Sequence, residues 1–120
     1  MAEILRAKTF VDKRGSLTVI EKVVPFDIRR IFFIYGVSDD RGNHRHKRNR
    51  TALVCVSGSC KVKVNTGKSI GIYDLDEPEK ILILGPEEFR TMYDFSPNAI
   101  LLALVSEYYD PDDYIDEPQS

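Results

Sequence analysis

The stretch Arg41-Gly-Asn-His44-Arg-His46-Lys-Arg-Asn-Arg50 holds both histidines of the chain, two positions apart. Apolar alternation resumes just after it, in Leu53-Val-Cys-Val56. On a β-strand, residues two apart project to the same face, so one strand would carry the two imidazoles side by side. Neutral imidazole accepts a proton and imidazolium returns it, and both forms are accessible near neutral pH. If the pair faces a cavity, this pattern predicts proton transfer between adjacent carbon atoms of a ligand.

Strand signals dominate the rest of the chain, and no long segment has helical periodicity. Positions 60–64 alternate clearly, with Lys61 and Lys63 facing water and the residues between them facing inward. Many short strands separated by turn signals predict an all-β protein built as a two-sheet sandwich or a small barrel. Short runs rich in β-branched and aromatic residues occupy 17–20, 31–35, 52–56, 60–64, 70–73, 81–84, 91–95 and 100–105.

Length and composition predict a single cytoplasmic domain over residues 1–120. Hydrophobic content of 42% and charged content of 30% are ordinary for a globular protein. The longest apolar run, 99–105, is far shorter than the roughly 20 residues of a membrane-spanning helix, and the N-terminus lacks the apolar stretch of a secretory signal. We therefore expect no membrane association. Cys55 and Cys60 flank a turn and are interpreted as small core side chains.

Charge is distributed unevenly along the chain. Positions 41–50 are locally basic, whereas every charged residue from Glu107 onward is acidic. Basic side chains near a cavity suit a phosphorylated ligand. The basic cluster lacks interleaved aromatic residues and the pI is about 5.7, so we expect no nucleic-acid partner. The acidic, aromatic arm from about 108 is interpreted as a docking arm with one short turn, rather than as part of a catalytic site.

The histidine spacing resembles the first motif of the cupins, Gly-x5-His-x-His-x3/4-Glu-x6-Gly. Here His44-x-His46 is followed at the right intervals by Thr51 and Gly58, but Thr51 stands where a metal-binding cupin has its Glu. The second cupin motif ends in a His, and Thr91 stands at that position. The resemblance implies a cupin double-stranded β-helix, also called a jelly-roll barrel. Two of the four expected ligands are missing, so we predict no bound metal.

A narrower resemblance covers nearly the whole chain. The ordered matches are similar to those of the WxcM-like sugar 3,4-ketoisomerases. This family implies a cofactor-free isomerase that moves the ketone of dTDP-4-oxo-6-deoxyglucose from C4 to C3, for the synthesis of deoxyamino sugars of bacterial surface glycans such as lipopolysaccharide O-antigen. The matches are Asp12-x-Arg14-Gly15-x-Leu17, Pro25-Phe26-x-Ile28-x-Arg30, Arg41-Gly42-x-His44-x-His46-Lys47, Leu53-Val-Cys-x-x-Gly-Ser-Cys60, Gly85-Pro86, Asp94-Phe-Ser96 and Tyr108-Tyr-Asp-x-x-Asp-Tyr-Ile115.

The resemblance places the proton-transferring histidine of the family at His46, which we predict to be the catalytic base. His44 is the predicted donor to the enediolate oxygen, as a protonated ring or as a neutral N–H, and Tyr35 is a second candidate. Guanidinium groups meet phosphate oxygens bidentately, so Arg41 and Arg30 are predicted diphosphate ligands. Arg14 is predicted to reach the sugar. Exposed strand edges and the habit of the family predict a homodimer.

Other functions stay open, and two departures from the family favour the first of them. Members commonly carry Gln near Thr51, and an aromatic residue followed by His where this chain has Phe89-Arg90. A non-catalytic cupin that binds a nucleotide sugar is one alternative. A sugar 3,5-epimerase is another, although such enzymes are usually longer chains with a His-Asp dyad and a Tyr acid. A metal-dependent cupin that uses the two histidines and waters is the third.

Overall fold

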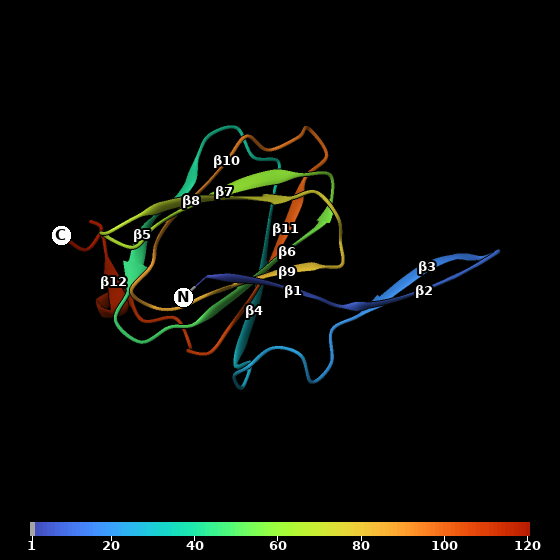
Figure 1. Cartoon of the computed structure of the whole chain (residues 1–120), viewed down its shortest axis with the longest axis horizontal. Coiled ribbons are helices and arrows are strands. Elements are labelled where there is room, and N and C mark those ends of the chain that lie inside the picture. Colours follow the sequence, from blue (N-terminus) through green and yellow to red (C-terminus); the bar gives the residue numbers. More distant parts are fainter. Residues whose placement is uncertain (1) are drawn as a thin grey trace.

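The computed structural model describes residues 2–120 as an almost entirely β protein (Figure 1). Within residues 2–120, twelve strands and one short 3-10 helix follow each other. They are β1 (Glu3–Arg6), β2 (Lys8–Asp12), β3 (Gly15–Val19), β4 (Arg30–Tyr35), β5 (Arg41–His46), β6 (Thr51–Ser57), β7 (Cys60–Asn65), β8 (Ile70–Leu75), β9 (Lys80–Leu84), β10 (Phe89–Tyr93), β11 (Ile100–Val105), η1 (Pro111–Asp113) and β12 (Tyr114–Ile115).

The strands form two five-stranded antiparallel sheets and one separate hairpin. One sheet has the order β1-β9-β6-β11-β4, and the other has the order β12-β5-β10-β7-β8. Except in the β7–β8 hairpin, neighbours in each sheet are not consecutive in sequence, as expected for the cupin jelly-roll barrel, which confirms the predicted fold class. The hairpin β2-β3 projects from the barrel, and the molecule extends 50 Å along its longest axis (Figure 1).

The main core lies between the two sheets. Leu53, Val62, Leu82 and Leu101 are at most 2% exposed there, and each contributes roughly 1.5–3 kcal/mol through burial. A second cluster covers the outer face of the first sheet, where Val54 and neighbouring side chains pack against the segment 20–26. Strand β6 is therefore buried on both faces from 51 to 55, which explains its continuous apolar run. Cys55 and Cys60 are free thiols in the core, as predicted.

Strand β5 needs a local irregularity to pair with β10. The register shifts between Arg90 and Thr91, and Gly42 and Asn43 both have positive φ, 89° and 59°. A Cβ atom at Gly42 would lie 2.9 Å from the carbonyl oxygen of Arg90, so only glycine permits this close approach. Asn43 is held by a hydrogen bond of 2.9 Å from the Thr91 hydroxyl to its Oδ1. The bulge leaves the following residues of β5, including both histidines, regular.

Candidate active site

The barrel encloses a cavity of about 400 Å³ between its two sheets. Strands β4, β5, β6, β10 and β11 supply its walls, and β12 of the C-terminal tail closes one side. Four of the predicted site residues line this cavity: His44, His46, Arg30 and Arg41. The full lining is Arg30, Phe32, Ile34, Asp40, Arg41, Gly42, His44, His46, Asn49, Thr51, Leu53, Arg90, Met92, Val105 and Tyr114.

His46 forms a buried pair with an aspartate from the C-terminal tail. Its Nδ1 lies 2.9 Å from Oδ2 of Asp113, and both side chains are only 4% exposed. The carboxylate also accepts hydrogen bonds from the backbone amides of Arg48 at 2.8 Å and Asn49 at 3.3 Å. A carboxylate that accepts from its neighbours fixes the proton of the neutral ring on Nδ1. The lone pair of His46 is therefore left on Nε2.

His44 is held in the same tautomer by a different acceptor. Its Nδ1 lies 3.0 Å from the carbonyl oxygen of Gly42, which accepts a hydrogen bond only from a protonated nitrogen. Its ring centroid is 4.8 Å from that of His46, with the two planes nearly perpendicular at 88°. Both imidazoles therefore present Nε2 as their uncommitted nitrogen. The sequence prediction that two adjacent imidazoles share one face of a strand agrees with this geometry.

Burial keeps both rings neutral. Desolvation lowers the pKa of His46 to about 4, and the charge of Arg90 and the neighbouring His44 act in the same direction, against the opposing effect of Asp113. Desolvation also lowers the pKa of His44, against the effect of the hydrogen bond to Gly42. A neutral His44 with its proton on Nδ1 cannot donate from Nε2. The prediction that a neutral His44 is an N–H donor to the enediolate therefore does not agree with the hydrogen bond from its Nδ1 to the Gly42 carbonyl.

Arg90 places a buried cation at the back of the cavity. It is 2% exposed, and burial lowers its pKa to about 10, so it remains charged at neutral pH. Nε donates to the carbonyl of Glu88 at 2.9 Å, Nη1 to the hydroxyl of Thr51 at 3.2 Å, and Nη2 to the carbonyl of Gly85 at 3.0 Å. These bonds fix the guanidinium rigidly. Thr51 and Arg90, the two departures from the family pattern, are therefore direct partners.

The arginines predicted to bind phosphate line the cavity through β4 and β5. Arg41 is exposed, and neither it nor Arg30 forms an ion pair with any carboxylate of residues 2–120. The Arg30 guanidinium lies 5.2 Å from the ring centroid of Phe32 and 5.6 Å from that of Tyr109. Its Nε donates to the carbonyl of Glu107 at 3.4 Å, and stacking on aromatic rings leaves the Nη edge available to an anion.

Tyr35 and Arg14 lie away from the cavity within one chain. Alternation along β4 turns Phe32 and Ile34 inward, so Tyr35 points outward, 69% exposed and stacked on Phe33 with ring centroids 5.9 Å apart. The side chain of Arg14 is 86% exposed at the turn of the projecting hairpin and pairs with Asp12 at 2.6 Å. The structure does not bring either residue to the site, which corrects the placement expected for them in a single chain.

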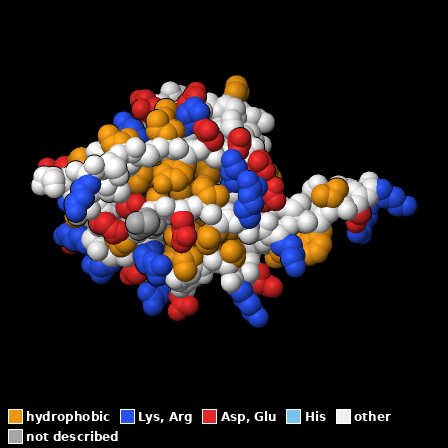
Figure 2. Space-filling model, viewed as in Figure 1, with side chains coloured by type: hydrophobic (Ala, Val, Ile, Leu, Met, Phe, Trp, Pro, Cys, Tyr) orange, Lys and Arg blue, Asp and Glu red, His pale blue; other side chains and the backbone are white. Residues whose placement is uncertain are grey.

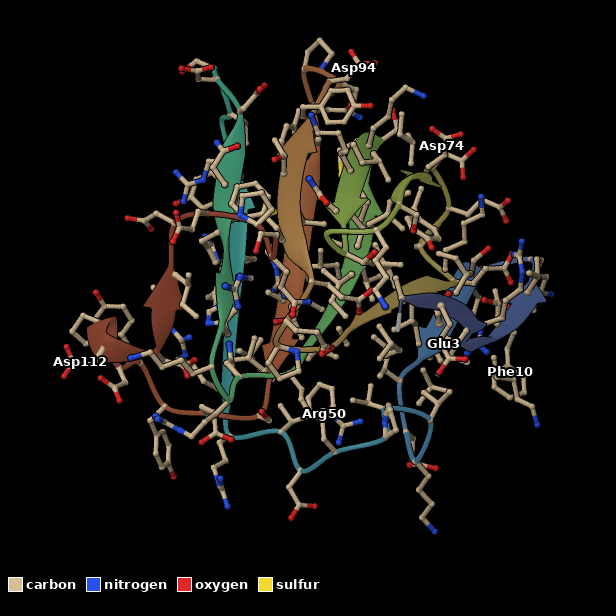
Figure 3. All side chains as sticks on the ribbon, turned by 60° about the vertical axis from the view of Figure 1, so that its left-hand side comes forward. Glu3, Phe10, Arg50, Asp74, Asp94 and Asp112 are labelled. Carbon is tan, nitrogen blue, oxygen red and sulfur yellow. The ribbon has the colours of Figure 1, made fainter. Side chains whose placement is uncertain are left out.

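The C-terminal tail contributes more to the site than the sequence indicates. Tyr114 pairs with His46 in the β5–β12 ladder, and its ring centroid lies 4.8 Å from that of His44 and 4.6 Å from that of His46. Figure 3 shows the tail that carries Asp112 beside β5, whereas the hairpin that carries Phe10 lies at the far side of the molecule. The arm docks on its own chain and supplies both Asp113 and Tyr114 to the site. Our interpretation that it is not part of the site is therefore corrected.

Two further observations concern metals and membranes. Within residues 2–120, no group of three or more His, Cys, Asp or Glu side chains is arranged to hold a metal ion. None of the helical structure in that part of the chain is long and apolar enough to span a lipid bilayer.

A closed pair of antiparallel sheets that carries two imidazoles on an inner strand defines a cupin-type barrel with a site suited to proton transfer. A family model described as "FdtA: WxcM-like, C-terminal" matches residues 1–120. The chain therefore belongs to the WxcM-like family.

Similar proteins of known activity are sugar ketoisomerases. The chain is 39% identical over 117 residues to a TDP-4-oxo-6-deoxy-alpha-D-glucose-3,4-oxoisomerase from Aneurinibacillus thermoaerophilus, covering 94% of this chain and 84% of that one. A 3,4-ketoisomerase from Helicobacter canadensis superposes with a TM-score of 0.92 at 36% identity, over 97% of this chain and 90% of that one. A histidine-to-asparagine variant of the 3,4-ketoisomerase QdtA from Thermoanaerobacterium thermosaccharolyticum, in complex with TDP-4-keto-6-deoxyglucose, superposes with a TM-score of 0.92 at 38% identity, over 97% and 87%.

Proposed function

We propose that the protein is a 3,4-ketoisomerase that converts dTDP-4-oxo-6-deoxyglucose to a dTDP-3-oxo-6-deoxyhexose for deoxyamino-sugar synthesis. The observation that carries this proposal is the pair of neutral imidazoles, His44 and His46, side by side in the cavity. The 3,4-ketoisomerase activity of the related proteins supports the reaction and the class of substrate.

The reaction starts with removal of the proton at C3, which the C4 carbonyl acidifies. His46 is the proposed base, because Asp113 leaves its lone pair on Nε2 and burial keeps the ring unprotonated. As the ring gains the proton, the adjacent carboxylate stabilises the imidazolium through the Nδ1–H bond. A positioned base of this kind contributes roughly 10²–10⁴-fold to the rate.

The second half of the reaction returns a proton to C4 and removes the proton of the C3 hydroxyl. The imidazolium of His46 delivers the proton to C4. His44 is the proposed acceptor for the hydroxyl proton, because its Nδ1 bond to Gly42 also leaves a lone pair on Nε2. The step requires neither a redox cofactor nor a metal, and the fixed cation of Arg90 in the cavity is unfavourable to a second cation.

Arg41 and Arg30 are the proposed ligands of the diphosphate. They line the same cavity as the imidazoles, are free of carboxylate partners within residues 2–120, and present planar N–H edges. The placement is suited to a nucleotide whose sugar reaches the histidines.

We infer that the protein is a homodimer. The hairpin β2-β3 exposes Phe10, Val11 and Leu17 at 56%, 74% and 61%. Figure 2 shows hydrophobic side chains on the projecting arm. The outer face of β4 exposes a second group, Ile31, Phe33 and Tyr35, at 58% to 69%. A two-stranded hairpin is only marginally stable without a further surface to pack on, and apolar surfaces of this kind mark interfaces. A second copy that covers them would also be needed to bring Arg14 of the hairpin to a cavity that holds the two histidines. The free thiols of Cys55 and Cys60 support a cytoplasmic location.

The test of the activity is incubation with dTDP-4-oxo-6-deoxyglucose in D₂O, followed by NMR of the ring protons. An isomerase produces the 3-oxo sugar and introduces deuterium at C3 or C4, and His46→Asn abolishes both. Binding without deuterium incorporation would identify a non-catalytic cupin. Deuterium at C5 would identify a 3,5-epimerase, which must be tested because the His46–Asp113 pair and Tyr114 are the features expected of that class.

A further inference from the structure

The proposed isomerisation needs a proton donor that neither imidazole provides. When the C3 proton leaves, the electrons of the C4 carbonyl move onto its oxygen, and a hydrogen-bond donor must meet the growing negative charge. His44 and His46 are both neutral, and both commit their single proton to acceptors on the far side of the ring, Gly42 and Asp113. Both rings are therefore bases at this point in the reaction.

Tyr114 lies where such a donor is required. Strand β12 holds it opposite His46 in the ladder with β5, and its ring contacts both imidazoles with centroids 4.8 Å and 4.6 Å away. The side chain is half-buried, lines the cavity, and is close enough to Arg90 to influence the titration of the guanidinium.

The Tyr114 hydroxyl is also uncommitted. Across residues 2–120 it donates no hydrogen bond to the protein, whereas all three guanidinium nitrogens of Arg90 donate to Glu88, Thr51 and Gly85. Its O–H is therefore a neutral donor that is free to meet an oxygen of the ligand. The ring that carries it contacts both bases.

We propose that Tyr114 is the catalytic acid that protonates the C4 oxygen, an inference that rests on the proposed ketoisomerase function. His46 takes the C3 proton, the C3–H electron pair forms the C3–C4 double bond, and the carbonyl oxygen takes the proton of the Tyr114 hydroxyl, giving a neutral enediol and a phenolate. In the second half, His44 takes the C3 hydroxyl proton, the C3 ketone forms, and C4 takes the proton held by His46. The proton on His44 then returns to the phenolate, so every group regains its starting state.

The test is Tyr114→Phe, which keeps the ring against both imidazoles and removes only the hydroxyl. Loss of one donor to a developing oxyanion lowers kcat by about 10²–10³-fold. We expect that loss with an unchanged KM, an unchanged affinity for TDP and an unchanged thermal unfolding midpoint. Because Tyr114 assists enediol formation itself, deuterium entry at C3 from D₂O should fall in proportion to conversion. Tyr108→Phe, which removes the hydroxyl of a 72% exposed tyrosine in the same tail, is the matched control and should match the wild type.

Each other outcome overturns a separate statement. If the wild type turns over the sugar and the Tyr114→Phe variant is equally active, Tyr114 takes no part in the chemistry, and the ketoisomerase proposal is unaffected. Loss of conversion with deuterium entry at C3 preserved places Tyr114 after enediol formation, which contradicts its assignment as the acid at the C4 oxygen. A wild-type protein that neither converts nor labels the sugar refutes the ketoisomerase function, and with it the role of Tyr114.

Discussion

Replacing Asp113 by asparagine tests the buried pair on which the proposed base depends. The carboxylate accepts three hydrogen bonds, from His46 Nδ1 at 2.9 Å and from the backbone amides of Arg48 and Asn49 at 2.8 Å and 3.3 Å. An asparagine side chain has one acceptor oxygen, so its NH₂ group must face at least one of these donors. Hydrogen bonds to a charged partner contribute about 1.5–3 kcal/mol each, so we expect Asp113→Asn to lower the free energy of unfolding by roughly 2–4 kcal/mol. For a domain of this length that corresponds to a Tm about 10 °C lower.

The effect on turnover depends on which way the amide faces. If the NH₂ group faces His46, Nδ1 must accept and the ring proton moves to Nε2, so the base loses its lone pair. If the oxygen faces His46, the tautomer is kept but the imidazolium loses its stabilising charge. Both orientations lower kcat, by about 10²–10⁴-fold where the base is lost entirely.

The assay combines urea denaturation, steady-state turnover and long-range ¹H–¹⁵N NMR of the imidazole nitrogens, which reports the tautomer directly. Asp112→Asn is the matched control, because Asp112 is the exposed neighbour of the buried Asp113. A stable Asp113→Asn variant with wild-type kcat would falsify the role of the carboxylate in positioning His46.

Four further outcomes are expected. Burial lowers the pKa of His46 to about 4, so kcat/KM, which needs the neutral ring, should rise with pH through about 4. Because this pKa lies below the ordinary value of about 6.5, the unfolded state binds more protons between these values, and the free energy of unfolding measured in urea should fall as the pH is lowered through that range. The fall should be smaller in His46→Asn, in which the lowered pKa of His44 still contributes. Arg41→Ala should raise KM for the nucleotide sugar with little change in kcat, and an unchanged KM would remove Arg41 from the phosphate site. Sedimentation should give a dimer of the wild type and a monomer of Leu17→Glu, and a monomeric wild type would contradict the inferred dimer.

The sequence predicts those parts of the fold whose pattern is set by alternation. All eight predicted strands are present within one or two residues of their expected bounds, and β7 follows the expected order of buried and exposed side chains. The shared face of His44 and His46 follows from the same period of two. Strands β1, β2 and β12 were not predicted. Strand β12 has only two residues, which are too few to show a period.

The failures at the site have equally physical causes. The run Ile31-Phe-Phe-Ile-Tyr35 is apolar on both faces, so its composition cannot tell which alternate residues face the cavity, and the candidate donor Tyr35 points outward. Asp113 belongs to a tail of uniform acidic charge, and only its tertiary contact with His46 distinguishes it from its exposed neighbours. Arg90 departs from the family pattern in sequence, yet its hydrogen bond to Thr51 shows that two departures form one arrangement.

The C-terminal tail links the folding of this barrel to its chemistry. It is held on β5 by the amide of Lys47 donating to the carbonyl of Asp113 at 2.9 Å and by Nε of Arg45 donating to the carbonyl of Glu117 at 2.9 Å. The same segment packs Tyr114 over both imidazoles, and the burial that results contributes to lowering their pKa values. Neutral imidazoles at physiological pH are what a base needs, and the Asp113 carboxylate that arrives with the tail stabilises the charge that forms on His46. The groups that prepare the bases therefore come from a segment more than sixty residues away in sequence, and the site exists only in the chain with its tail docked.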